Sequence, residues 1–425
     1  MNKRASSQSF VPSWRSVVPR EVTAALTPVD RVLTCVLRLD TAHDDPGLCR
    51  ELILRVDDWD ELLVAARVHG LQPLLYGALR RHGLSDAVPF SVAGVLRSSY
   101  LASAAFASFA LVELGRIAAA LAAQDTRAMS VKGPILGTEL YADPAERPFS
   151  DLDLLVKEES WPAFRETLLA LGYKAGEHDT RQLPLRLLPQ VGLDHVYEFT
   201  GPQGLRVEVK FDPLELGLQM HDIAGVWERA VDATTPAGAP LLRPSREDEL
   251  LMLCVHLNRH GYQRLLWLAD IAFLVSQQGP EIDWNLLGAR ARAEGVESSV
   301  HHTLRLAGLL LGTPIPAVAL ERTAPSPVRK RVWRSTWPLA DVLAFGGAHE
   351  AALVFRKRLT CPWLAKNLLL TGRVAEKTAY FARRAVPPRE FLLDKYRTEQ
   401  GGSSYLRALG QRYRTALRRP RKAQV

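Results

Sequence analysis

The sequence predicts an α+β protein in which a small mixed sheet is flanked by predominantly helical regions. Apolar residues recur at three- and four-residue spacing through residues 29–125 and again after residue 247, a pattern that indicates helices on both sides. Between these regions lie short apolar runs at 128–131 and 151–156. A further segment, 195–211, alternates in two-residue steps on either side of a Gly-Pro-Gln-Gly turn, which is typical of an antiparallel hairpin.

The 425 residues exceed what one ordinary hydrophobic core holds, so we expect several domains. Helical spacing, strand-like runs and proline breaks divide the chain into a helical region, an α/β core, a helical domain and a basic, mostly helical region. These four regions are predicted at 1–125, 126–215, 216–328 and 329–425.

The first elements are helices. Residues 59–67 and 73–79 place apolar side chains on one face, with Asp57 or Asp58 as the cap of the first helix and Gly70 at its end. Residues 101–124 predict a long Ala/Leu helix. Trp161–Leu171 is expected to be helical, and so are 247–275 and 284–311.

Composition and targeting signals favour a soluble cytoplasmic protein. The residues are 47% hydrophobic and 24% charged, which excludes wholesale disorder. Four well-separated cysteines without a CxxC pair argue against a disulfide scaffold or a zinc ribbon, and they fit a reducing compartment. The uncharged stretch at 98–112 is shorter than the ~20 residues of a spanning helix. We therefore expect no transmembrane segment, and residues 1–20 contain no apolar signal core.

The net charge of +8 is unevenly distributed. Residues 329–425 contain 22 Lys and Arg against 6 Asp and Glu, whereas the other residues contain 32 against 40. Within the basic region, 403–419 predicts an amphipathic helix with Leu406, Leu409, Tyr413 and Leu417 on one face. Such a helix either packs on the acidic body or docks on an acidic partner, a membrane surface or nucleic acid.

The residues most suited to catalysis begin with a carboxylate pair. Asp151 and Asp153 lie two apart on a predicted strand, so they share one face while Leu152 and Leu154 point into the core. Their α-carbons are then roughly 6.5–7 Å apart. Two carboxylates at this spacing are suited to bind Mg²⁺ or Mn²⁺, which would offset the charge of phosphates undergoing displacement.

Two other segments add to this pair. The Lys132-Gly133 turn joins a strand to a helix that Pro134 can begin, and helix amides beside a glycine form a phosphate cradle. On the hairpin strand 205–211, Arg206, Glu208 and Lys210 share one face. If that strand lies beside the Asp151 strand, Glu208 becomes a third carboxylate that binds metal or accepts the proton of an attacking hydroxyl, with Glu198 a weaker candidate.

These motifs, in this order, resemble the uncharacterised nucleotidyltransferase family of the DNA polymerase β-like superfamily. The matching positions are Lys132-Gly133, Tyr141, Arg147 and the Asp-Leu-Asp-Leu-Leu-Val run at 151–156, and the resemblance covers about 55–300. It implies a polymerase β-like core that moves a nucleoside monophosphate from an NTP such as ATP to an acceptor hydroxyl, with Mg²⁺. Asp151, Asp153 and Glu208 are then the catalytic and metal-binding residues, and Lys132, Gly133, Arg147 and Lys210 bind the nucleotide.

The resemblance continues into a downstream helix that carries His256, His260 and Asp270. The two histidines are four residues apart, a spacing that binds zinc with a third ligand such as Asp270, or they line the cleft opposite the nucleotide. Arg264 is one option as the buried partner of Asp270. His301 and the neighbouring His302 are expected to face solvent, and Cys254 is expected to pack in the core.

Two departures from the family pattern bear on activity. The third strand usually reads Asp-Leu-His-Trp, but here it reads Glu208-Val209-Lys210-Phe211, and Lys210 either binds phosphate or weakens metal affinity. The Gly133-Pro134 turn lacks the hydroxyl and the backbone donor of the usual Gly-Ser. The leading interpretation is an enzyme acting on a small molecule, a peptide or a protein. The alternatives are a catalytically weak or inactive nucleotide-binding or regulatory protein, and a nucleic-acid-modifying enzyme recruited by the basic tail.

Overall fold

A computed structural model describes residues 26–41, 45–176, 196–214 and 220–336, with five isolated positions between 372 and 389 and the short segment 405–411. The first part is helical, as the sequence predicts. Asp58 caps the helix that contains the predicted 59–67 segment, by accepting a hydrogen bond from the Glu61 amide at 2.8 Å. The helices of this part are α3 (Pro28–Leu39), α4 (Pro46–Ile53), α5 (Trp59–Val68), α6 (Gln72–Arg81) and α7 (Phe90–Ala122).

The cysteine expectation is corrected at the N-terminal end. Cys35 on α3 and Cys49 on α4 form a disulfide across a Cα–Cα distance of 5.8 Å. The two helices pack side by side, which brings together residues that are 14 positions apart in the chain. The cysteine count therefore does not indicate a reducing compartment, and a cytoplasmic location stays a proposal.

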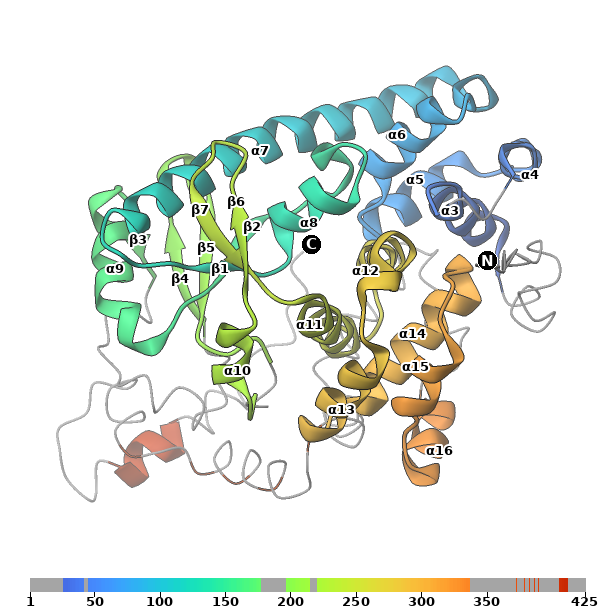
Figure 1. The fold of residues 1–425 in the computed structure, drawn as a ribbon. Helices are drawn as coiled ribbons and strands as arrows, with labels where there is room; N and C mark the ends of the chain where they lie inside the picture. Colours follow the sequence, from blue (N-terminus) through green and yellow to red (C-terminus); the bar gives the residue numbers. More distant parts are fainter. Residues whose placement is uncertain are drawn as a thin grey trace, which may run out of the picture.

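Helix α7 begins earlier than the predicted 101–124 helix and has 33 residues. By length and composition alone it is apolar enough to cross a membrane, and it is the single such helix among the described residues. In Figure 1 it runs across the top of the molecule from α6 to the sheet, and it contacts α5, α6, α8, α9 and β7. These contacts cover part of the helix, because 44% of its apolar window is buried whereas Phe90, Leu101 and Val112 are exposed.

The α/β part is a seven-stranded mixed sheet in the order β3-β4-β5-β2-β1-β7-β6. Strands β2 and β5 are parallel neighbours, and β4 and β5 form the predicted antiparallel hairpin. The strands are β1 (Met129–Ser130), β2 (Asp151–Leu155), β3 (Lys174–Ala175), β4 (Val196–Thr200), β5 (Arg206–Lys210), β6 (Val231–Thr234) and β7 (Pro240–Arg243).

The sheet extends beyond the predicted 126–215 core. Strand β7 pairs with β1 in parallel and brings β6 with it, so residues 231–243 belong to the sheet and not to a purely helical domain. This short strand pair has too few alternating apolar residues to stand out in the sequence. Helices α8 (Gly133–Leu140), α9 (Trp161–Ala170) and the short α10 (Ile223–Glu228) complete this part.

The predicted helices at 247–275 and 284–311 are each divided in two. Gly261 and Tyr262 adopt positive φ angles of 64° and 59°, which end one helix before the next begins. The resulting helices are α11 (Arg246–Arg259), α12 (Leu265–Gln278), α13 (Trp284–Ala293) and α14 (Glu297–Leu311), followed by α15 (Ala317–Arg322) and α16 (Pro327–Thr336). His301 and His302 lie on α14 and are buried, so the expectation that they face solvent is wrong.

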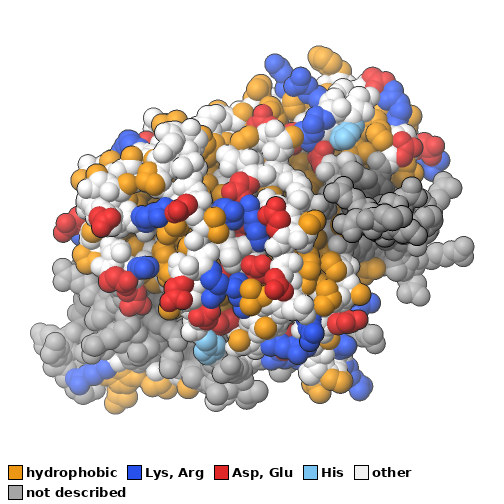
Figure 2. Space-filling model, in the orientation of Figure 1, with side chains coloured by type: hydrophobic (Ala, Val, Ile, Leu, Met, Phe, Trp, Pro, Cys, Tyr) orange, Lys and Arg blue, Asp and Glu red, His pale blue; other side chains and the backbone are white. Residues whose placement is uncertain are grey.

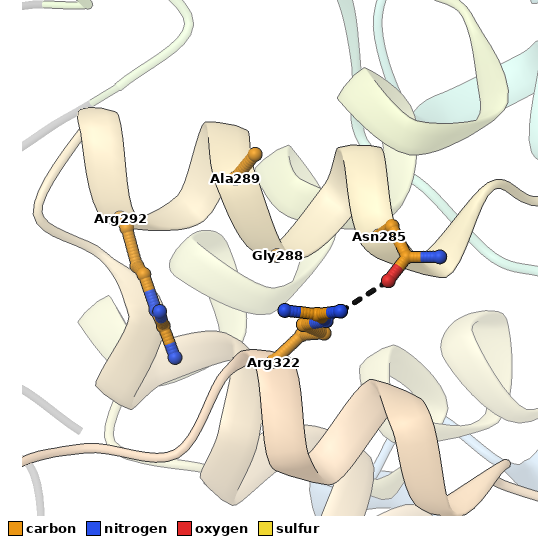
Figure 3. Close-up of a pocket in the computed structure, with 5 residues that line it drawn as sticks. All are labelled: Asn285, Gly288, Ala289, Arg292 and Arg322. Carbon is orange, nitrogen blue, oxygen red and sulfur yellow. Dashed lines mark hydrogen bonds between the residues drawn. The ribbon is translucent and has the colours of Figure 1, made fainter.

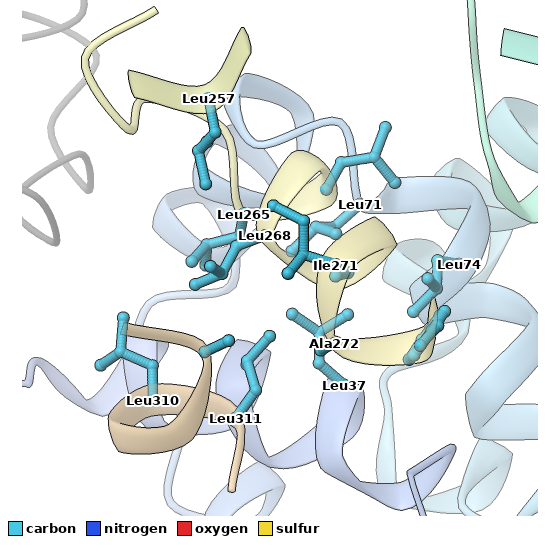
Figure 4. Close-up of a cluster of buried hydrophobic side chains, with 14 of the residues drawn as sticks. Leu37, Leu71, Leu74, Leu257, Leu265, Leu268, Ile271, Ala272, Leu310 and Leu311 are labelled. Carbon is cyan, nitrogen blue, oxygen red and sulfur yellow. The ribbon is translucent and has the colours of Figure 1, made fainter. Parts of the chain in front are cut away.

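Two hydrophobic clusters organise the fold. One joins the N-terminal helices to α11, α12 and α14, and Figure 4 shows its leucines from these separate helices meeting around Ile271. The other lies between α7, α9 and the sheet, and includes the predicted inward residues Leu152 and Leu154. The predicted helical regions on either side of the sheet therefore share one core.

Most of the basic C-terminal region lies outside the described residues, including Tyr413 and Leu417. In the described part of the predicted amphipathic helix, Ala408 is buried while Leu406 is 68% exposed. Over the face shown in Figure 2, acidic and basic side chains are interspersed and no field of one sign forms.

Candidate active site

The carboxylates meet because β2 and β5 are parallel neighbours. Their register places Asp153 opposite Glu208, and alternation along β2 puts Asp151 on the same face. The opposite faces of both strands carry buried apolar residues such as Leu152 and Val207. Strand β5 thus lies beside β2, which is the condition under which Glu208 becomes the third carboxylate of one cluster.

A cavity of about 270 Å³ lies over this cluster. All ten sequence-predicted site residues line it, although they come from five separate segments of the chain. They are Lys132, Gly133, Arg147, Asp151, Asp153, Glu208, Lys210, His256, His260 and Asp270.

The ammonium of Lys210 sits inside the carboxylate cluster. Its Nζ lies 2.5 Å from Oδ1 of Asp153 and 3.5 Å from Oε2 of Glu208, and the side chain is buried. Burial alone would raise the pKa of Asp153, but the nearby Lys210 and Lys132 lower it to about 2. Burial opposes the charge on Lys210, yet Asp153 and Glu208 raise its pKa, so both partners are ionised at neutral pH.

The other two carboxylates differ from Asp153. Burial and the neighbouring Asp153 raise the pKa of Asp151, and the Arg206 guanidinium, 3.3 Å away, opposes this rise. Burial also raises the pKa of Glu208, a change that Lys210 opposes. A carboxylate with a raised pKa is a better proton acceptor, so Asp151 and Glu208 are both better suited to general-base catalysis than Asp153.

The carboxylate oxygens have the chemistry that Mg²⁺ and Mn²⁺ require. Asp151, Asp153 and Glu208 would hold such an ion. In the described part of the chain, however, no three His, Cys, Asp or Glu side chains are already arranged to hold a metal. Because Lys210 is bound to Asp153, metal binding by these three carboxylates would require that ion pair to open.

Replacing Lys210 with methionine is therefore expected to raise Mn²⁺ affinity at least roughly tenfold, because a cation no longer competes for Asp153. Electron paramagnetic resonance of free Mn²⁺ measures this affinity without any turnover. Lys174→Met, at an exposed lysine on β3, is the matched control and should leave it unchanged. An unchanged or weaker affinity in Lys210→Met would contradict competition between the ammonium and the metal.

The Lys132-Gly133 turn lies at the start of α8, and its backbone is strained. Lys132 has a φ of 66°, which is unusual for a residue with a side chain, and Gly133 follows at 48°. Pro134 lies at the start of the helix as predicted. The turn directs the Lys132 ammonium toward Nδ1 of His256, at 2.8 Å.

Burial lowers the pKa of Lys132 to about 7, and Lys210 adds to the effect. Burial and these two lysines hold the pKa of His256 well below its usual range, so this imidazole is neutral and its Nδ1 accepts a hydrogen bond from the Lys132 ammonium. Lys132 therefore lines the cavity while it is held by a histidine on α11.

Arg147 is held by hydrogen bonds to Asp270 and to the turn. Its Nε lies 2.7 Å from Oδ1 of Asp270, and its Nη2 lies 2.8 Å from Oδ2 of the same carboxylate. Its Nη1 donates a hydrogen bond to the Gly133 carbonyl at 3.2 Å. Tyr141 donates to the same aspartate at 2.6 Å. Both charged groups are buried, so Arg147 braces the turn against α12. Arg147 also lines the cavity, and its contact with a triphosphate stays a prediction.

The same contacts correct two expectations for Asp270. Because its carboxylate already binds Arg147 and Tyr141, it is not available as a third zinc ligand for the histidines. Nor is Arg264 its partner, because the Arg264 guanidinium lies over the Trp267 ring, 5.2 Å from the centroid. The rings of His256 and His260 pack on Trp267 at centroid distances of 4.8 and 4.7 Å, and they line the cavity.

Sequence reasoning missed several residues that line this cavity. Arg259 and Trp267 lie within the downstream helical motif, but helical spacing gave no sign that they face the carboxylates. Pro148, Phe149 and Ser150 precede the Asp-Leu-Asp run and line the cavity from a loop. Their nearness to Asp151 in the sequence was the available signal.

A separate hollow of about 380 Å³ lies between α13 and α15. Its lining residues include Asn285, whose amide oxygen accepts a hydrogen bond from Arg322 at 2.9 Å, as Figure 3 shows. Gly288 packs closely against Arg322, because a Cβ at this glycine would lie 2.5 Å from the Cβ of Arg322. No acidic side chain is among the described residues that line this hollow, so these residues lack the chemistry of the carboxylate cavity.

Three carboxylates on parallel strands, beside a lysine–glycine turn that begins a helix, define a site for phosphoryl or nucleotidyl transfer. The chain belongs to the family described as uncharacterised nucleotidyltransferase, whose family model matches residues 56–312. This span confirms the resemblance and covers more than half of the chain, and membership implies transferase activity on an NTP. No functionally curated protein matches the sequence.

Proposed function

We propose that this protein moves a nucleoside monophosphate from an NTP to an acceptor hydroxyl, with Mg²⁺ as the cofactor. The single observation that carries the proposal is the alignment of Asp151, Asp153 and Glu208 on paired strands within one cavity. The adjacent Lys132-Gly133 turn supplies a cation and helix amides for phosphates. A bound Mg²⁺ would offset negative charge on the phosphates during displacement.

The transfer is a substitution at the α-phosphorus. The acceptor oxygen forms a bond to this phosphorus, the bond from the α-phosphorus to the bridging oxygen breaks, and pyrophosphate leaves with that oxygen. Glu208 accepts the proton of the acceptor hydroxyl, in keeping with its raised pKa. Lys132 and Lys210 stabilise phosphate charge, and Lys210 does so after it leaves Asp153.

Incubation with each α-labelled NTP and Mg²⁺ tests the proposal. We expect one nucleotide to give a labelled product and pyrophosphate, and Asp151→Asn to reduce the product strongly. Asp232→Asn, at an exposed aspartate on β6 that pairs with Arg127, is a suitable control because it lies outside the cavity. Equal product from wild type and Asp151→Asn would exclude the carboxylate cluster as the catalytic site.

Lys132 makes nucleotide binding depend on pH. With a pKa of about 7, its amine is charged below this value and neutral above it. We expect ATP affinity to fall roughly tenfold between pH 6 and pH 8, the effect of about 1.4 kcal/mol from one charge-assisted hydrogen bond. Fluorescence titration at both pH values measures it, and Lys132→Arg should flatten the dependence because arginine stays charged. The same slope in both proteins would contradict this role for Lys132.

One observation favours a second function. Lys210 already neutralises Asp153, so the cluster is stable without a metal, as in a nucleotide-binding or regulatory protein with weak or no catalysis. Saturable ATP binding without labelled product or pyrophosphate would support this alternative. Turnover that Asp151→Asn removes would exclude it.

A further inference from the structure

A second cavity, of about 360 Å³, adjoins the carboxylate cavity. The two share Pro148, Phe149 and Ser150 from the loop before β2, together with Arg264 at the start of α12. Because Ser150 immediately precedes Asp151, a molecule in the second cavity lies beside the proposed reaction centre. The second cavity therefore has the position expected of an acceptor site.

The walls of this cavity are polar and positively charged. Arg67, near the end of α5, lines the second cavity and not the first, whereas Arg264 lines both. The hydroxyls of Ser99 and Ser103 enter from α7, and Gln72 lies at the start of α6 with its amide bound to the Leu63 carbonyl at 2.9 Å. No aspartate or glutamate is among the described residues that line the cavity.

The two guanidinium groups have little local compensation. Across the described residues, neither the exposed Arg67 nor Arg264 forms an ion pair with a carboxylate, whereas the buried Arg147 of the adjoining cavity pairs with Asp270. Arg264 rests on the Trp267 ring, which leaves the hydrogen-bond donors at the edge of its guanidinium. Two such groups beside serine hydroxyls are suited to bind a carboxylate or a phosphate.

We propose that the second cavity binds the acceptor, and that the acceptor is a small anionic molecule bearing a carboxylate or phosphate near the hydroxyl that attacks. This inference rests on the proposed nucleotidyl transfer and names its substrate class. The volume of about 360 Å³ suits a small molecule. Arg67 and Arg264 bind its anionic group, and the shared loop directs its hydroxyl toward Asp151 and Glu208.

Equilibrium binding to the full-length protein, measured by calorimetry, tests the inference without any turnover. The probes are glycerol 3-phosphate, glycerate and glycerol, which share a three-carbon skeleton and differ in charge and anionic group. We expect at least one of the two anions to bind tenfold or more tightly than glycerol. The stronger of the two shows whether the cavity prefers phosphate or carboxylate.

Arg67→Gln is the decisive variant because Arg67 is the arginine that lines the second cavity but not the carboxylate cavity. It should weaken the binding of the preferred anion at least tenfold and leave ATP affinity unchanged. Arg80→Gln, at an exposed arginine on α6 outside the cavity, should change neither. Equal binding of glycerol and the anions, no binding of any probe, or an unchanged anion affinity in Arg67→Gln would overturn the inference.

The two proposals fail separately. If labelled NTP is turned over but anions do not bind in an Arg67-dependent manner, the acceptor class is wrong and the transferase proposal stands. If anions bind through Arg67 but no NTP binds or reacts, the cavity is an anion site and the transferase proposal fails.

Discussion

Asp153→Asn is expected to reduce nucleotidyl transfer at least about 10³-fold, because it removes a buried carboxylate from the proposed Mg²⁺ site. Loss of several kcal/mol of charge stabilisation in the transition state corresponds to this factor. The same change also leaves the Lys210 ammonium buried, with Glu208 at 3.5 Å as its remaining carboxylate. Loss of one partner of a buried pair costs about 3–5 kcal/mol of unfolding free energy. Labelled-NTP turnover and chemical denaturation measure the two effects.

A double variant separates catalysis from folding. Asp153→Asn combined with Lys210→Met removes both charges, and replacing a buried ion pair with neutral groups is often close to neutral for stability. We expect the double variant to recover most of the lost unfolding free energy and none of the transfer activity. Recovery of both would mean that Asp153 acts through folding alone.

Arg147→Met is expected to lower the free energy of unfolding by about 3–5 kcal/mol. It leaves the fully buried Asp270 carboxylate with the Tyr141 hydroxyl but without its bidentate cation. The change also removes the hydrogen bond that fastens the Gly133 carbonyl, so nucleotide affinity falls as a consequence of a looser turn. Chemical denaturation gives the stability change, and ATP titration gives the affinity.

Arg206→Met is the matched control for this variant. Arg206 pairs with Asp151 at 3.3 Å, but it is 47% exposed at the side chain, so its loss should cost no more than about 1 kcal/mol. Combining Arg147→Met with Asp270→Leu should restore much of the lost stability. If Arg147→Met instead has normal stability but weaker ATP binding, Arg147 contacts the triphosphate directly and does not brace the turn.

Helix and strand types followed from the sequence because local periodicity determines which face of an element is apolar. The alternation around Asp151 and Glu208 predicted two strands with acidic residues on one face, and both strands have that form. Strands β6 and β7 were missed because four residues carry too little alternation. The pairing of Cys35 with Cys49 was missed because it depends on how α3 packs against α4.

Motif spacing and the family resemblance singled out ten residues that all line the carboxylate cavity, although other lining residues such as Arg259 and Trp267 were missed. Their individual partners were not predictable. The pairing of Arg147 with Asp270, 123 positions away in the chain, was not predicted, and Arg264, which was one option as the partner of Asp270, lies on Trp267. Long polar side chains reach several neighbours, and packing between distant segments decides which one they meet.

The sequence by itself determined that an Asp-Leu-Asp strand, a lysine–glycine turn and a carboxylate-bearing hairpin occur in the order of a nucleotidyltransferase. These features depend on neighbours within a few positions, where alternation and turn chemistry act. Only the tertiary structure decided that Lys210 occupies the carboxylate cluster and that Arg67 and Arg264 line an adjoining cavity. Such placements depend on the register between strands and on the packing of helices far apart in the chain, which local patterns do not specify.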